Sequence, residues 1–308
     1  MITVGEMSST SIENCVLYSR PESRELSMTF SFHHLKIDYL NGSKWELAEP
    51  DIAKLRSLFC QWQEKMQAGG GWNALFWSNH DQPRPVSRFG DDQRYWLVSA
   101  KMLATCIHLM QGTPYIYQGE ELGMTNPSFS DISQYRDVES LNYYQILLEQ
   151  GKSKQDALKI LACRSRDNSR TPMQWSAGEN AGFTTGKPWI EVCQNYKRIN
   201  AEEEIDDPRS VWAYYHRLIQ LRKKMPLISR GDIHFIDTGC EKVIAYLRCL
   251  EKERLLVLCS FSDEQTTVHK VLVPANSKCL IGNYSDTAVP YGNTLVLRPY
   301  EALAFIWS

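Results

Sequence analysis

The sequence lacks three features that would place it in common functional classes. Its formal net charge is only −2 over 308 residues, so it has no basic excess for binding nucleic acid or an anionic membrane. No apolar run approaches the roughly 20 residues of a transmembrane helix. The first residues contain no basic segment followed by an apolar one, which is the pattern of a secretory signal. These absences predict a cytoplasmic protein.

The nine cysteines include no Cys-x-x-Cys pair, and their number is odd. Cys60, Cys106 and Cys259 lie in apolar runs, where a reduced cysteine serves as a small hydrophobic residue. With 43% hydrophobic and 23% charged residues, the chain can bury a sizeable core. The composition therefore predicts a globular protein, with room for one large and one smaller domain.

Strand-like and helix-like segments alternate through the first 120 residues. β-branched residues 2–4 lead directly into Gly5 and Glu6. The segments that follow are, in order, a strand at 26–34, a helix beginning near Pro50, a strand at 72–81, a helix at 93–110 and a strand at 115–119. This alternation predicts βα units and a parallel sheet.

The pattern changes in the last third of the chain. Residues 124–205 are less regular and are expected to contain loop, and a helix is predicted over 210–225. After Pro226 come five strand-like runs separated by turn residues, at 242–250, 253–262, 267–273, 293–299 and 302–308. They predict a small antiparallel β domain over residues 227–308, with the α/β part in residues 1–226.

Two carboxylates, Glu6 and Asp81, stand at the ends of predicted strands. In parallel βα barrels that edge is where active sites form, and a pair of carboxylates is the minimum for glycoside hydrolysis. Either acid alone could equally be a helix cap or a surface residue. In the triplet "NHD", His80 could likewise be a structural histidine. Arg166 and Arg170 could form a solvated face or a fork that binds a carboxylate or sugar hydroxyls.

Several long motifs resemble the α-amylase superfamily of glycoside hydrolases. They are "TVGEM", "NHDQPRPVSRFGDD", "GTPYIYQGEELGMTN", "YRDVESLN" and "SRDNSRTPMQW". They are most similar to the oligo-1,6-glucosidase branch, which also holds the trehalose-6-phosphate hydrolases, and the likeness covers essentially the whole chain. The resemblance implies an α/β fold: the C-terminal half of a (β/α)8 barrel, strands five to eight, in residues 1–226, then the β domain. It implies no cofactor, and no metal site is expected.

The resemblance also implies roles for five residues. Glu6 would be the general acid/base at the end of barrel strand five. Asp81 would hold the 2- and 3-hydroxyls of the distorted sugar, and His80 and Arg166 would contact the same ring. Glu139 would line the neighbouring subsite.

One family feature is missing from the sequence. The family's Asp nucleophile lies in a "GFRxD"-like motif upstream of the strand that carries the general acid/base, and the sequence has no such motif. We therefore expect a truncated chain that is inactive alone. Its natural partner would be the missing N-terminal half of the barrel.

A basic loop after the second strand indicates the substrate. It contains His33, His34, Lys36 and Lys44, and it is either a solvated basic loop or a phosphate clamp. A clamp points to hydrolysis of the disaccharide phosphate trehalose 6-phosphate to glucose and glucose 6-phosphate. The segments "GEMSSTSIENC" and "LSMTFSFHHLKIDY" also resemble the trehalose-6-phosphate hydrolases more closely than the isomalto-oligosaccharide enzymes. One alternative is an oligo-1,6-glucosidase or other α-glucosidase acting on an unphosphorylated substrate. Another is a non-catalytic amylase-like protein that binds a sugar or a partner, which the retained acids disfavour.

Overall fold

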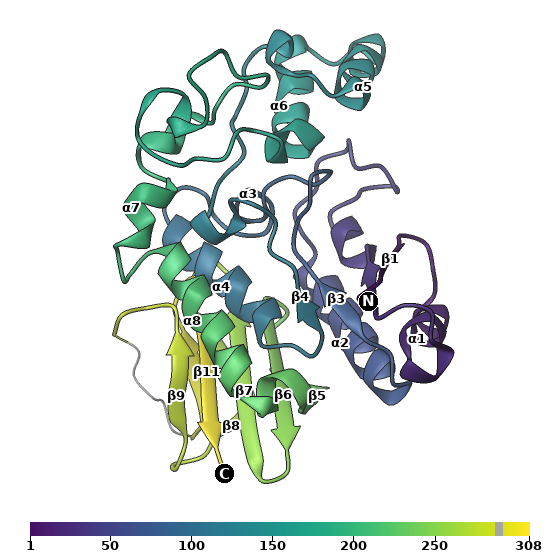
Figure 1. Ribbon diagram of the computed structural model, residues 1–308, viewed down its shortest axis with the longest axis vertical. Helices are drawn as coiled ribbons and strands as arrows, with labels where there is room; N and C mark the ends of the chain where they lie inside the picture. Colours follow the sequence, from purple (N-terminus) through teal and green to yellow (C-terminus); the bar gives the residue numbers. More distant parts are fainter. Residues whose placement is uncertain (287–291) are drawn as a thin grey trace.

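The computed structural model describes residues 1–286 and 292–308. Within these residues, a parallel sheet of four strands occupies the first part of the chain (Figure 1). Its order follows the chain: β1 (Val4–Met7), β2 (Met28–Ser31), β3 (Asn73–Leu75) and β4 (Thr113–Pro114). Because neighbouring strands are parallel, all four carboxyl ends lie at one edge of the sheet.

Helices connect these strands, as the alternation in the sequence predicted. They are α1 (Ile12–Ser19), α2 (Ile52–Ala68), α3 (Pro85–Phe89) and α4 (Trp96–His108). The helix expected near Pro50 begins at Ile52, because the side chain of Asp51 caps it by accepting a hydrogen bond from the backbone N–H of Lys54 at 2.8 Å. α1 was not predicted from the sequence.

All four strands of the parallel sheet differ from their predicted limits. The strand predicted at 26–34 is β2, which ends at Ser31, and His33 and His34 lie in the 3-10 segment after it. β1 continues past Glu6, because its backbone pairing with β2 runs from Val4 to Met7. β3 ends at Leu75, so Asp81 lies in the loop beyond the strand. The strand predicted at 115–119 was wrong: β4 lies just before it and ends at Pro114, and beyond it the N–H of Tyr115 still donates to the carbonyl of Leu75 at 2.7 Å.

Residues 124–205 contain more helix than the sequence indicated. They form α5 (Val138–Glu149), α6 (Lys154–Arg164) and α7 (Ala201–Ile205), and α5 and α6 lie together at one end of the molecule (Figure 1). These helices are short and weakly amphipathic, and Val138 at the start of α5 is exposed, so their periodicity was hard to detect. Short 3-10 segments lie at Pro21–Ser23, His33–Lys36, Glu120–Leu122, Ile132–Gln134, Arg166–Ser169, Glu179–Gly182 and Gln194–Lys197.

The C-terminal part begins after α8 (Val211–Lys224) and α9 (Pro226–Arg230). Within the described residues it has a five-stranded antiparallel sheet in the order β5-β6-β7-β11-β9 and a two-stranded sheet of β10 and β8. The strands are β5 (Asp232–Phe235), β6 (Val243–Leu250), β7 (Glu253–Ser260), β8 (Thr266–Val273), β9 (Lys278–Gly282), β10 (Gly292–Leu297) and β11 (Ala302–Trp307). The sequence predicted all of these except β5 and β9.

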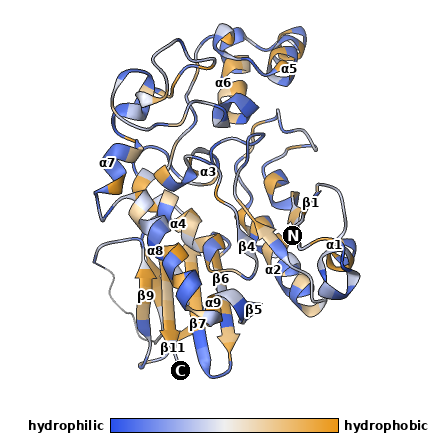
Figure 2. Ribbon diagram, viewed as in Figure 1, coloured by the Kyte–Doolittle hydropathy of each residue, from blue (hydrophilic) through white to orange (hydrophobic). Residues whose placement is uncertain are grey.

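The two parts share one hydrophobic core. α4 lies against β7 and β11 of the five-stranded sheet, whose strands are strongly apolar, and α8 packs against α4 (Figures 1 and 2). Tyr246 on β6 donates to the carbonyl of Cys106 in α4 at 2.8 Å. The buried Arg248 donates to the carbonyls of Leu109 at 2.6 Å and Ile228 at 2.8 Å, so it caps the carboxyl ends of α4 and α9. No helix in residues 1–286 or 292–308 has the length and apolar character needed to cross a membrane.

Candidate active site

Glu6 and the residues after β3 line one cleft at the carboxyl edge of the parallel sheet. The cleft has a volume of about 160 Å³, and Glu6, Asn79 and His80 supply polar groups to its wall. Glu6 is exposed, which leaves its carboxylate accessible. The neighbouring wall is aromatic and consists of Phe30, Phe32, Phe76, Tyr115 and Tyr117. An aromatic cleft with a few convergent polar groups is typical of a small-molecule site.

Asp81 lies beside the cleft and is held by Arg170. Nη2 of Arg170 is 2.7 Å from Oδ1 of Asp81, and Nε of Arg170 donates to the carbonyl of His80 at 2.8 Å. Arg166 is more distant from Asp81, with Nη1 at 3.7 Å, and the His80 ring lies 3.6 Å from the other carboxylate oxygen. Of the two arginines that the sequence singled out as a possible fork, Arg170 binds the Asp81 carboxylate directly, and Arg166 lies farther from it.

Glu139 joins Arg166 to one lysine of the basic loop. Nζ of Lys44 is 2.6 Å from Oε2 of Glu139, and Nε of Arg166 is 2.8 Å from the same oxygen. Burial lowers the pKa of Lys44, although Glu139 acts in the opposite direction. The charges alternate along the series Lys44, Glu139, Arg166 and Asp81, which brings together four residues predicted to belong to the site.

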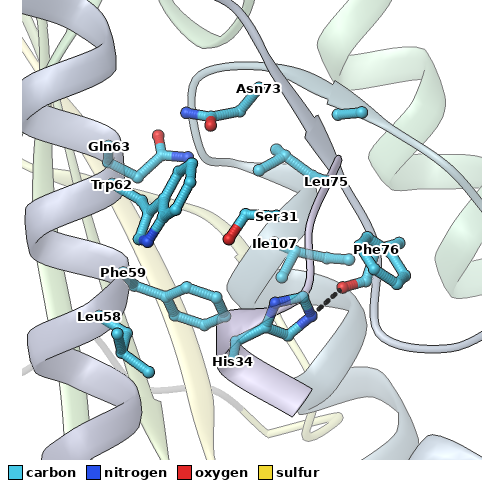
Figure 3. Close-up of a pocket in the computed structure, with 11 residues that line it drawn as sticks. Ser31, His34, Leu58, Phe59, Trp62, Gln63, Asn73, Leu75, Phe76 and Ile107 are labelled. Carbon is cyan, nitrogen blue, oxygen red and sulfur yellow. Dashed lines mark hydrogen bonds between the residues drawn. The ribbon is translucent and has the colours of Figure 1, made fainter. Parts of the chain in front are cut away.

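The two histidines of the basic loop have different surroundings. His34 is buried, and its Nε2 lies 2.9 Å from the carbonyl of Phe76, in the wall of a small interior cavity between α2 and the sheet (Figure 3). Burial lowers the pKa of His34 to about 4, so its ring is neutral at pH 7. His33 is half-buried and lies against the ring of Trp62, with 5.1 Å between ring centroids. Burial, and then the charge of Lys36, lower the pKa of His33.

Lys36 and Lys44 contact different elements. Nζ of Lys36 donates to the carbonyl of Ser8 at 3.4 Å, just beyond the end of β1. Lys36 is exposed, whereas Lys44 is half-buried in its ion pair with Glu139. Of these two lysines, Lys36 is the one that faces solvent, and its contact with Ser8 places it two residues beyond Glu6 along the chain.

Glu120 is a buried acid behind the cleft that sequence reasoning did not identify. Its carboxylate accepts hydrogen bonds from Oγ of Ser78 at 3.0 Å and from the hydroxyl of Tyr215 at 3.1 Å. Burial raises the pKa of Glu120 to about 7. Glu120 lay inside one of the long motifs, but no pattern in the sequence indicated that it would be buried. In residues 1–286 and 292–308, no group of three His, Cys, Asp or Glu side chains is arranged to hold a metal ion.

The model of the alpha-amylase catalytic domain matches residues 1–231. The chain belongs to the α-amylase family. The half of a (β/α)8 barrel followed by a small antiparallel β domain, predicted from the sequence, is confirmed.

Individual members of the α-amylase family are strongly similar to the chain. The trehalose-6-phosphate hydrolase of Bacillus subtilis (strain 168) is 54% identical over 306 residues, covering 99% of the chain and 54% of that relative. That of Escherichia coli (strain K12) is 50% identical, covering 98% and 55%. The oligo-1,6-glucosidase of Parageobacillus thermoglucosidasius is 44% identical, covering 99% and 55%.

A solved structure of the α-amylase family agrees closely with the fold. The crystal structure of Bacillus licheniformis trehalose-6-phosphate hydrolase superimposes with a TM-score of 0.94 at 53% identity, covering 99% of the chain and 56% of that protein. The chain spans about half the length of the curated relatives it matches.

Proposed function

We propose that these residues form the acid/base and sugar-binding side of a retaining glycoside hydrolase. The observation that supports this is the placement of Glu6 and His80 in one cleft, with Asp81 beside it. Glu6 protonates the glycosidic oxygen as the bond breaks and then takes a proton from the attacking water. Asp81 accepts hydrogen bonds from the 2- and 3-hydroxyls of the sugar, and His80 and Arg166 contact the same ring.

The proposed substrate is trehalose 6-phosphate, which would yield glucose and glucose 6-phosphate. Two relatives at 54% and 50% identity carry the name trehalose-6-phosphate hydrolase. Lys36 is an exposed ammonium near Glu6, suited to a phosphate of roughly −1.5 to −2 charge. Lys44 would bind the phosphate by giving up its ion pair with Glu139. A charged sugar phosphate does not cross a bilayer unaided, which is the support for a cytoplasmic location.

A second candidate is hydrolysis of an unphosphorylated α-glucoside. Two of the four residues expected to bind phosphate are shielded from solvent, because Lys44 is half-buried in its ion pair with Glu139 and His34 is buried against the carbonyl of Phe76. The relative at 44% identity is named an oligo-1,6-glucosidase. A neutral sugar would leave the pair of Lys44 and Glu139 intact.

The retaining mechanism also needs a nucleophile opposite the general acid. Asp81 is assigned to the sugar hydroxyls, so the proposal places the nucleophile outside residues 1–308. The missing N-terminal half of the barrel would supply it, and the 308 residues alone would bind sugar without turnover.

A hybrid enzyme tests both candidates. In this hybrid, residues 1–308 replace the matching part of the Bacillus subtilis relative, and hydrolysis of trehalose 6-phosphate is compared with that of trehalose and isomaltose. A strong preference for the phosphorylated disaccharide supports the first candidate, and a preference for isomaltose supports the second. The Glu6→Gln variant of the hybrid is the inactive control. A folded hybrid that hydrolyses none of the three disaccharides, and so behaves like this control, would contradict both candidates.

A further inference from the structure

A single buried carboxylate connects the segments that carry most of the proposed sugar-binding residues. We propose that Asp38 is a positioning residue that fixes three such segments relative to one another. This inference rests on the proposed function for its catalytic consequence. Its structural part can be tested without any activity.

The contacts of Asp38 are made almost entirely out of solvent. Its side chain is 2% exposed, and those of Arg88 and Arg164 are 4% and 6% exposed. Arg88 binds the carboxylate with two hydrogen bonds, Nη2 to Oδ1 at 2.7 Å and Nε to Oδ2 at 2.9 Å. Arg164 donates from Nη1 to Oδ2 and from Nη2 to the backbone carbonyl of Asp38, the latter at 3.0 Å.

The first segment is the loop after β2, to which Asp38 itself belongs. It carries Lys36 and Lys44 on either side of Asp38. Nη2 of Arg88 also reaches this loop, donating to the carbonyl of Leu35 at 2.5 Å. The position of both lysines therefore depends on the contacts that the loop makes with Arg88 and Arg164.

The second and third segments are held through the two arginines. Nη1 of Arg88 donates to Oε1 of Gln82 at 2.8 Å, and Gln82 directly follows Asp81. Arg164 is the last residue of α6, two positions before Arg166. Loosening Asp38 therefore displaces the groups proposed to hold the sugar. Glu6 lies on β1, which none of the hydrogen bonds described here for Asp38, Arg88 and Arg164 reaches.

The electrostatics make the carboxylate hard to replace. Two buried guanidiniums share one negative charge, so a neutral side chain at position 38 would leave both cations without a counter-ion. Burial acts to raise the pKa of Asp38, but the hydrogen bonds and charges of Arg88 and Arg164 lower it on balance. An asparagine would keep the shape while losing the charge, which makes Asp38→Asn the appropriate test.

A matched control exists in the C-terminal part. Glu301 is also a buried carboxylate, 4% exposed, and accepts hydrogen bonds from Nε and Nη2 of Arg298 at 3.0 and 2.5 Å. It lies next to β11, in the C-terminal β part rather than in the segments that carry the proposed sugar-binding residues. Glu301→Gln therefore removes a comparable buried charge without touching the three segments.

The experiment measures hydrogen exchange and kinetics. In both the 308-residue chain and the hybrid, Asp38→Asn should speed amide exchange in residues 79–83 and 164–170, while β6 and β7 stay protected. In the hybrid, kcat/KM should fall roughly 100-fold, as expected for a displaced binding group. Glu301→Gln should change kcat/KM less than threefold, even if it lowers Tm by as much as Asp38→Asn does.

Three results would overturn the proposal: full kcat/KM in Asp38→Asn, an equal loss in Glu301→Gln, or exchange that rises evenly over the whole chain. If Asp38→Asn does not fold, Arg88→Lys keeps the charge but loses the bonds to Leu35 and Gln82. It should show the same local exchange with a smaller kinetic loss. If the unmodified hybrid is inactive, the proposed function fails. If Asp38→Asn leaves amide exchange at residues 79–83 and 164–170 unchanged, the positioning role alone is contradicted.

Discussion

The guanidinium of Arg170 binds the Asp81 carboxylate at 2.7 Å and the carbonyl of the preceding residue, His80, at 2.8 Å. One side chain therefore fixes both the orientation of the acid and the backbone that carries it. Such a fork needs two donors in a fixed geometry, which arginine provides and lysine does not.

Arg170→Lys should therefore reduce kcat/KM of the hybrid by about tenfold, because one of two charge-assisted hydrogen bonds is lost. Arg170→Ala should cost more, since Asp81 then keeps only its longer contacts with Arg166 and His80. Steady-state kinetics on one substrate measure both. Arg209→Ala, which breaks an exposed ion pair with Asp207, is the control and should have no effect. Unchanged kinetics in Arg170→Ala would exclude a role for the fork.

Glu6→Gln should abolish hydrolysis of substrates with poor leaving groups. An activated aryl glucoside should lose much less in the glycosylation step, because its leaving group needs little protonation. Pre-steady-state measurement of that step in the hybrid, for a series of leaving groups, tests the assignment. An equal loss across the series would mean that Glu6 is not the acid.

Lys36→Ala should raise KM for trehalose 6-phosphate more than KM for trehalose. A lost charge-assisted hydrogen bond is worth about 1.5–3 kcal/mol, or tenfold and more in affinity. Lys44→Ala should show the same selectivity only if Lys44 exchanges Glu139 for phosphate. Lys278→Ala on β9 is an exposed control in the C-terminal part. Equal changes for both substrates would remove the support for a phosphate clamp at either lysine.

The contribution of Glu120 and Glu204 to the free energy of unfolding should fall as pH rises from about 4.5 to about 7, whereas that of the buried His34 and His108, whose pKa values burial lowers to about 4 and about 3, should rise over the lower part of this range. Burial raises the pKa values of Glu120 and Glu204 to about 7, so both acids keep a proton in the folded chain that they lose on unfolding in this range. Each contributes up to about 1.4 kcal/mol per pH unit. Glu120→Gln should make the slope of the unfolding free energy against pH more positive by up to about 1.4 kcal/mol per pH unit, and the exposed control Glu253→Gln should leave it unchanged. Denaturant unfolding at several pH values measures the slope, and no change in Glu120→Gln would contradict the assignment.

Residues 1–308 alone should not hydrolyse trehalose 6-phosphate and should tend to associate. Among the described residues β1 pairs only with β2, so its other edge presents free backbone groups to another chain. Adding the N-terminal part of the Bacillus subtilis relative should reduce association and restore hydrolysis. Sedimentation and an activity assay test this, with Glu6→Gln as the inactive control. A monomer that turns over substrate unaided would show that the nucleophile lies within the 308 residues.

Sequence patterns predicted the features that depend on local order. The alternation of strands and helices placed Glu6 and His80 at one sheet edge, because the carboxyl ends of parallel strands always meet there. The five strongest β runs of the C-terminal part were equally clear. α1 was missed because its eight residues leave too few turns to establish a period, and α5 was missed because its apolar residues form only a weak stripe.

Side-chain partnerships could not be predicted in the same way. Lys44 and Glu139 are 95 residues apart, and Asp38 and Arg164 are 126 apart, so these pairings follow from the packing of separate loops. The sequence identified His34 as a basic side chain, but its neutrality follows from burial that only the assembled core imposes. The same holds for the raised pKa of Glu120.

The hydrogen bonds of Arg248 have a consequence for any attempt to shorten this protein. A version that stopped at Pro226 would remove one of the two arginines that bind the carboxyl end of α4 and leave Arg222, which donates to the carbonyls of His108 and Met110, so that this end would be less firmly held. β4 begins at Thr113, only five residues after α4 ends, and Tyr115, which follows β4, forms part of the cleft wall. The C-terminal sheet is therefore a distant support of the candidate cleft, and a shortened version that keeps both arginines at the end of α4 would have to retain it.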